Sequence, residues 1–192
     1  MRIAFLHVDA ALLDLARQLA ASGGHTLTLV GDAGPHAAAL QALFPELQLI
    51  DNVEPLALGK AYDLLLVGLT GDAKPRLEEL RLLVQEAAPL AVVHPAAEAI
   101  DLYELGMIQH DTQSLLAGWN PVANSLGAAR TAEVVLSPEA PLGVLRQVAM
   151  QRRLVDVGRE AVVAQLACDL ELIERFAGPL DRITALAPGG DA

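Results

Sequence analysis

The sequence is poor in the residues on which several classes of protein depend. It has one cysteine in 192 residues, so no internal disulfide can form, and this usage fits a reducing compartment. Basic residues number 13 against 24 acidic ones, a formal net charge of −11. A chain with this balance is not expected to bind nucleic acid or an anionic membrane surface through its overall field.

Long apolar runs and a leader segment are also missing. No stretch reaches the roughly 18 uncharged apolar residues that would indicate a membrane span. The N-terminus has no basic region followed by an apolar run, so we expect no signal peptide and a soluble, cytoplasmic protein. Aromatic residues make up only 3%, whereas hydrophobic residues make up 53% and charged residues 19%. We therefore expect a substantial core built mainly from Leu, Val, Ile and Ala.

Strand-like and helix-like segments alternate through the first two thirds of the chain. The patterns predict strands near 2–8, 25–31, 47–50, 63–69, 89–95 and 107–110, with a further candidate near 133–136. They predict helices near 10–22, 35–43, 75–87, 96–106 and 121–130. Uninterrupted apolar strands that alternate with helices indicate a parallel sheet covered on both faces. The predicted fold is therefore α/β, a doubly wound, Rossmann-like parallel sheet over residues 1–137.

The pattern changes near Pro138 and Pro141. Residues 138–192 are expected to form a truncated α+β extension, with a strand over 142–154, a helix over 157–177 and a strand over 181–186. Two strands are too few to cover an apolar face. We therefore expect residues 142–187 to pair with another copy of the chain or with a longer relative.

The turn after the first strand lacks the glycines expected of a dinucleotide-binding unit. The order strand, turn, helix, strand and then an acid (Asp32) is that of such a βαβ unit. The turn at residues 7–12 reads HVDAAL, however, where the fingerprint would be G-x-G-x-x-G. Asp9 can cap the first helical N–H groups, and its charge would stand where a pyrophosphate binds. Both effects weaken phosphate binding.

Several segments resemble the Gfo/Idh/MocA family of NAD(P)-dependent oxidoreductases. The opening βαβ unit ends its second strand in Asp32, which matches the acid that often holds the cofactor ribose in that family. The strand PLAVVHP places Val93, His94 and Pro95 where the family has Glu-Lys-Pro. The segment LACDLELIERFAGPLDRITAL is similar to the family's Gly-Ile-His-Asp-Leu pattern, and PLGVLRQV is similar to the strand that opens the family's second domain.

The departures from the family pattern bear on activity. His94 replaces the lysine that the resemblance implies would assist proton transfer, and Cys168 replaces the second-domain histidine. The sequence also stops where the family continues into a large open sheet that forms the substrate site. The resemblance therefore implies a Rossmann scaffold whose usual active site is incomplete in this polypeptide.

The candidate site residues are expected at the carboxyl ends of the strands, where ligands of open α/β sheets bind. His94 is the candidate catalytic acid or base, with a hydrogen-bonded strand-end histidine as the alternative. His7, Asp9, Asp32, Trp119 and Asn120 are the candidates for lining the cofactor crevice. Three of them also have a structural interpretation: a helix cap for Asp9, a tight turn for Asp32 and a core position for Trp119.

Three further features give no prediction of a catalytic or metal site. His7, His94 and Asp9 are too scattered in the sequence to predict a metal site. Cys168 has no CxxC partner and is expected to be a small buried side chain. The basic patch at residues 151–153 is read as a solvated segment end or as a salt-bridged partner contact.

Three functions remain open from the sequence. The first is a degenerate Gfo/Idh/MocA-like protein, a pseudoenzyme that serves as a binding or assembly module, for which no cofactor is expected. The second is an NAD(P)-dependent oxidoreductase acting on a sugar or alcohol, with NAD or NADP as cofactor and a site completed by a partner chain. The third is a small-molecule sensor that uses the same crevice.

Overall fold

The computed structural model describes residues 1–58, 61–93, 99–137, 139, 145–151, 153–154 and 158–184. Internal contacts divide the chain into two units, Met1–Pro121 and Val122–Ala192. This division falls earlier in the chain than the boundary expected after residue 137. We describe each unit by itself.

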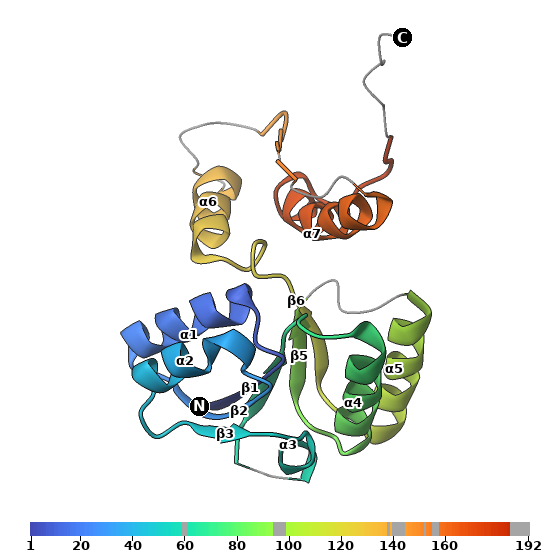
Figure 1. The fold of residues 1–192 in the computed structure, drawn as a ribbon. Helices are drawn as coiled ribbons and strands as arrows, with labels where there is room; N and C mark the ends of the chain where they lie inside the picture. Colours follow the sequence, from blue (N-terminus) through green and yellow to red (C-terminus); the bar gives the residue numbers. More distant parts are fainter. Residues whose placement is uncertain are drawn as a thin grey trace. The chain divides into compact units, whose positions relative to one another are not determined.

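The first unit is built on a six-stranded sheet in which all strands are parallel (Figure 1). The strand order is β3-β2-β1-β4-β5-β6, and the direction of winding reverses between β1 and β4. This is the order of a doubly wound Rossmann fold, and it confirms the predicted fold class. The strands are β1 (Arg2–Leu6), β2 (Thr26–Gly31), β3 (Gln48–Ile50), β4 (Leu64–Val67), β5 (Leu90–Val93) and β6 (Leu116–Trp119).

Helices cover both faces of this sheet (Figure 1). One face carries α1 (Ala10–Ser22) and α2 (Ala37–Leu43), preceded by the 3₁₀ turn η1 (Gly34–His36). The other carries α3 (Glu54–Leu58), α4 (Ala73–Gln85) and α5 (Ala99–Thr112). Because side chains alternate along a strand, β1 supplies Ile3 and Phe5 to the core under α1, and Ala4 and Leu6 to the core under α4.

The prediction of a strand at 107–110 is wrong. These residues belong to α5, which continues to Thr112, and the edge strand is β6. The reason is tertiary: Leu105 is buried in the core and Ile108, one helical turn later, packs against the same cluster. The apolar residues near 107 therefore have the spacing of a helix and not the alternation of a strand. The helix α3 was not predicted.

The second unit contains the helices α6 (Leu126–Leu136) and α7 (Arg159–Ala177). The Ser125 side chain accepts a hydrogen bond from the Ala128 N–H and caps α6, so this helix begins later than the predicted 121–130. It also covers residues 133–136, where a strand was a candidate. The α7 helix agrees with the helix predicted over 157–177.

The two strands expected in the C-terminal extension are not found where the structure describes them. Residues 145–151, 153–154 and 181–184 have neither strand nor helix structure. A β-strand is stable only when it is paired, and the described part of this unit supplies two helices but no strand edge. No described helix is long and apolar enough to cross a membrane.

Candidate functional site

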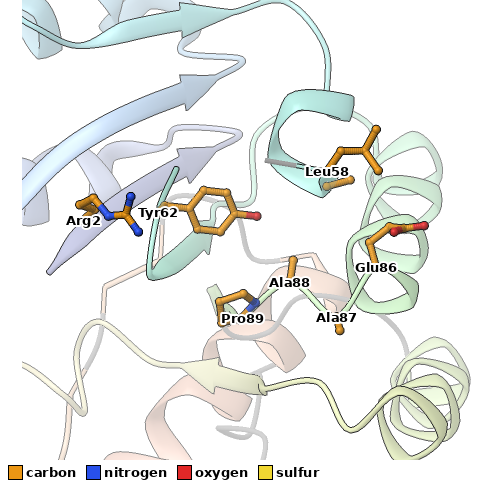
Figure 2. Close-up of a pocket in the computed structure, with 8 residues that line it drawn as sticks. Arg2, Leu58, Tyr62, Glu86, Ala87, Ala88 and Pro89 are labelled. Atoms are coloured by element: carbon orange, nitrogen blue, oxygen red, sulfur yellow. The ribbon is translucent and has the colours of Figure 1, made fainter. Parts of the chain in front are cut away.

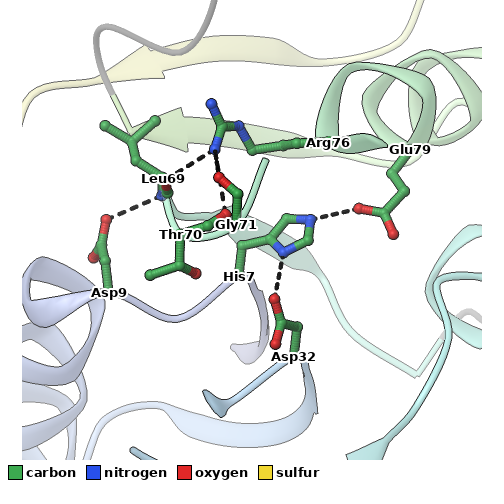
Figure 3. A network of polar contacts seen from close by, with 8 residues as sticks. All are labelled: His7, Asp9, Asp32, Leu69, Thr70, Gly71, Arg76 and Glu79. Atoms are coloured by element: carbon green, nitrogen blue, oxygen red, sulfur yellow. Dashed lines mark hydrogen bonds and ion pairs between the residues drawn. The ribbon is translucent and has the colours of Figure 1, made fainter. Parts of the chain in front are cut away.

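A network of polar side chains lies at the carboxyl ends of β1, β2 and β4, where the winding of the sheet reverses (Figure 3). The strand register brings its members together. Leu6 pairs with Gly31, and beyond the strand ends the His7 N–H donates to the Gly31 carbonyl oxygen at 3.2 Å. The Val8 N–H donates to the Asp32 carbonyl oxygen at 3.1 Å. The loops that carry His7 and Asp32 are therefore fixed side by side.

The Asp9 carboxylate joins the β1–α1 turn to the loop after β4. Its Oδ1 accepts a hydrogen bond from the Leu12 N–H at 2.9 Å, which caps α1. Its Oδ2 accepts from the Leu69 N–H at 3.1 Å. Each carboxylate oxygen thus binds a backbone amide of a different element. The capping role expected of Asp9 is confirmed.

His7 connects two carboxylates from different parts of the first unit (Figure 3). Its residue is only 8% exposed, and its backbone has a φ of 54°, a region that glycine normally occupies. The ring Nδ1 lies 2.8 Å from Asp32 Oδ2, and Nε2 contacts the Glu79 carboxylate on α4. Each ring nitrogen thus has a carboxylate oxygen as its partner.

The loop after β4 approaches His7 so closely that it needs glycine. A Cβ on Gly68 would lie 2.1 Å from the His7 carbonyl oxygen. The buried Arg76 closes this loop from α4: its Nη1 donates to the carbonyl oxygens of Leu69 at 2.9 Å and Thr70 at 3.2 Å. Charge-assisted bonds of this kind hold a loop more firmly than neutral ones.

The arrangement does not fit the pyrophosphate of a dinucleotide. The Leu12 N–H, one of the free amides at the start of α1 that would bind a phosphate, is already bound to Asp9. A carboxylate, which repels phosphate, stands at that helix end. No group of His, Cys, Asp and Glu side chains that could hold a metal ion occurs among the residues the structure describes.

The structure gathers three of the predicted site residues and separates the others. His7, Asp9 and Asp32 lie in the network shown in Figure 3. Trp119 ends the edge strand β6 and packs against the core that contains Phe5, and the following residue, Asn120, is fully buried. His94 lies outside the described residues. Cys168 lies half-buried on α7.

Sequence reasoning missed Glu79, Arg76 and Gly68. Glu79 and Arg76 are three residues apart in the predicted helix over 75–87, a spacing that puts both on one face. This spacing was the available signal, but only the fold shows that the face meets the end of β1. Gly68 follows a strongly apolar strand, and an isolated glycine there indicates a close backbone approach.

Comparisons with known proteins agree with this architecture. No protein-family model and no curated protein sequence matches the chain. Among solved structures, similarity extends to the WlbA dehydrogenase of Thermus thermophilus in complex with NAD and UDP-GlcNAcA. That match has a TM-score of 0.54 and 13% identity, over 70% of this chain and 46% of that one.

Two further structures show the same relationship. A probable dehydrogenase of Thermotoga maritima matches with a TM-score of 0.55 and 10% identity, over 71% of this chain and 41% of that one. A Bacillus subtilis protein named as an oxidoreductase matches with a TM-score of 0.53 and 14% identity, over 62% of this chain and 34% of that one. The chain thus spans less than half of each of these proteins. At this identity the likenesses establish the fold alone, a Rossmann-type α/β scaffold.

Proposed function

We propose that the protein is a non-catalytic relative of these oxidoreductases, a binding or assembly module whose own side chains fill the dinucleotide site. The observation that carries the proposal is the Asp9 carboxylate bound to the Leu12 N–H at the start of α1. An anion at a helix N-terminus is stabilised there, so the protein itself supplies the negative group that a phosphate would otherwise provide.

The electrostatic penalty for a bound dinucleotide is large. A phosphate charge within about 4 Å of the Asp9 carboxylate is repelled by about 4 kcal/mol at an effective dielectric constant of about 20. Since about 1.4 kcal/mol corresponds to a tenfold change in affinity, this repulsion weakens binding roughly a thousandfold.

The contact between His7 and Asp32 supports the same proposal. In Rossmann enzymes the acid after the second strand binds the cofactor ribose. Here Asp32 Oδ2 lies 2.8 Å from His7 Nδ1, and the second ring nitrogen contacts Glu79. The acid therefore has an internal partner where a ribose hydroxyl would bind.

The second unit supports a role in assembly. Ala123 is the one buried hydrophobic residue in its described part, and several large apolar side chains are exposed: Leu126, Val134, Leu136, Val162, Val163 and Leu166. Exposed apolar surface of this kind is typical of protein–protein contacts. We expect residues 142–187, within which α7 lies, to contribute to a contact with another copy of the chain.

Titration calorimetry with NADH and NADPH tests the proposal. The natural protein is expected to show no binding at millimolar nucleotide. Asp9→Asn keeps a capping side chain without the charge, and Asp9→Gly combined with His7→Gly restores two glycines of the fingerprint. The double variant is expected to bind at least tenfold more tightly than the Asp9→Asn variant, because the ribose acid is then also released.

Two results would contradict the proposal. One is micromolar binding of either nucleotide by the natural protein. The other is nicotinamide-dependent turnover of a sugar or alcohol that is lost in His94→Ala, which would support the oxidoreductase alternative. Sedimentation of the natural protein addresses the assembly role separately, since a monomer at micromolar concentration would argue against it.

A further inference from the structure

A cavity lies at the amino-terminal ends of the strands, opposite the network around His7. It has a volume of about 420 Å³, which falls in the range of about 300–1,000 Å³ typical of small-molecule pockets. Its walls come from the end of α3, the first residue of β1, the residue Tyr62 before β4, and the turn between α4 and β5 (Figure 2). No part of the proposed dinucleotide site contributes to it.

One side of the cavity is apolar. Leu58, the last residue of α3, is 73% exposed, and Ala57, Ala88 and Pro89 continue the same surface. The Tyr62 ring is held in place because its hydroxyl donates to the Leu56 carbonyl oxygen. This surface suits an aliphatic or aromatic ligand body.

The positive charge that Arg2 brings to the cavity is neutralised by Asp63. Arg2 Nη2 donates to Asp63 Oδ1 at 2.8 Å, and the Arg2 backbone N–H donates to Asp63 Oδ2 at 2.7 Å. These bonds hold the pKa of Asp63 below its usual value, so this carboxylate is ionised at neutral pH. The pair has no net charge with which to attract an anion.

Glu86 supplies a negative charge for which the described part of the chain provides no ion-pair partner. It caps the C-terminal end of α4, where the helix dipole is also negative, and the last turn of α4 contains no basic residue. Among the described residues no ion pair to the Glu86 carboxylate is found. An acid at this helix end is unfavourable for the protein by itself, and a bound cation would remove the repulsion.

The turn after α4 has no amide left for an anion. The N–H groups of Glu86, Ala87 and Ala88 donate to the carbonyl oxygens of Leu82, Val84 and Leu83, at 3.0, 3.1 and 3.0 Å. The cavity therefore combines an apolar wall with one uncompensated carboxylate and offers no donor from this turn.

We propose that this cavity binds a small organic amine in its protonated form. The ammonium group contacts Glu86 at the end of α4, and the apolar body lies along Leu58 and Tyr62. The proposal does not depend on the proposed function, because the two sites share no residue.

A titration of the ¹⁵N-labelled protein, followed by amide chemical shifts, tests this site with three matched probes. Hexylamine carries the charge and the apolar body, hexan-1-ol has only the body, and hexanoate has the opposite charge. Hexylamine is expected to bind about fivefold more tightly than hexan-1-ol, as for one partly exposed ion pair. Hexanoate is expected not to bind, and the shifts should concentrate at Glu86, Ala87 and Ala88.

Variants at three exposed positions distinguish the contribution of the charge from that of the apolar body. Glu86→Gln is expected to remove the preference for the amine over the alcohol. Leu58→Ser is expected to weaken both probes equally, and Glu46→Gln, which removes an exposed carboxylate elsewhere, should change neither. Equal affinity for hexylamine and hexan-1-ol, an unchanged preference in Glu86→Gln, or shifts spread over the acidic surface would each overturn the proposal. Absence of binding by hexylamine would do so as well.

Discussion

Asp9 connects two elements of the first unit through one side chain. Its carboxylate accepts hydrogen bonds from the amides of Leu12 and Leu69, and so links the start of α1 to the loop after β4. Glycine at the same place would leave the Leu12 amide free for a phosphate. In this protein Asp9 instead gives the Leu12 amide an internal partner.

At the scale of single residues, Tyr62 is expected to make the folding stability depend on pH. Burial raises the pKa of its hydroxyl to about 12, whereas the unfolded chain has a value of about 10. Between these values the folded protein keeps a proton that the unfolded chain has lost, so stability falls as the pH rises. The contribution is complete below pH 10, and about 2 kcal/mol is lost by pH 12.

Urea unfolding at several alkaline pH values measures this effect. Tyr62→Phe is expected to flatten the decline between pH 10 and pH 12, although it also loses the hydrogen bond to the Leu56 carbonyl oxygen. Tyr103→Phe is the matched control, since Tyr103 is 71% exposed and should leave the decline unchanged. A natural protein whose stability stays constant over this interval would contradict the assignment.

At the scale of the elements, the approach of β4 to β1 depends on Gly68. The Gly68 N–H donates to the Leu6 carbonyl oxygen at 2.8 Å, and a Cβ there would lie 2.1 Å from the His7 carbonyl oxygen. Neither of these backbone groups can move without breaking the two central strands apart.

Gly68→Ala is therefore expected to destabilise the protein by more than about 3 kcal/mol or to prevent folding. Gly24→Ala is the control, because a Cβ at Gly24 meets no atom within 4 Å. Its stability in urea should differ from that of the natural protein by less than about 0.5 kcal/mol. A Gly68→Ala protein of natural stability would show that the two loops separate easily.

The elements also show where sequence patterns succeed. The strand–helix alternation predicted β1 to β5 and the helices α1, α4 and α7, because each has a strong period of its own. It failed near residue 107, where a short apolar run fits either period, and in the described residues 145–151 and 153–154, where a strand needs a partner from elsewhere. The site was predictable for His7, Asp9 and Asp32, which follow strands, but not for Glu79, which reaches the network from a helix.

At the scale of the whole molecule, the two units differ in how much core they contain. Both hydrophobic clusters of the described structure lie entirely within Met1–Pro121. The described part of Val122–Ala192 buries only Ala123 among its hydrophobic residues. The first unit therefore has what a domain needs to fold alone, whereas the described part of the second does not.

A truncated chain of residues 1–121 is accordingly expected to unfold cooperatively in urea with native-like circular dichroism. The complementary chain of residues 122–192 should show weak, non-cooperative helicity at micromolar concentration, since an isolated helix pair without a core is marginal. Cooperative unfolding of the second fragment as a monomer would contradict this division of stability.

The sequence by itself determined the α/β class, the parallel sheet and the loss of the glycine turn, because periodicity and turn chemistry are local properties of the chain. Only the tertiary structure decided which groups contact the side chains that stand where the fingerprint has glycines. His7 meets Asp32 because β1 and β2 are paired, and it meets Glu79 because α4 packs beside the end of β1. Contacts between residues 25 and 72 positions apart follow from strand pairing and helix packing, which no local pattern encodes.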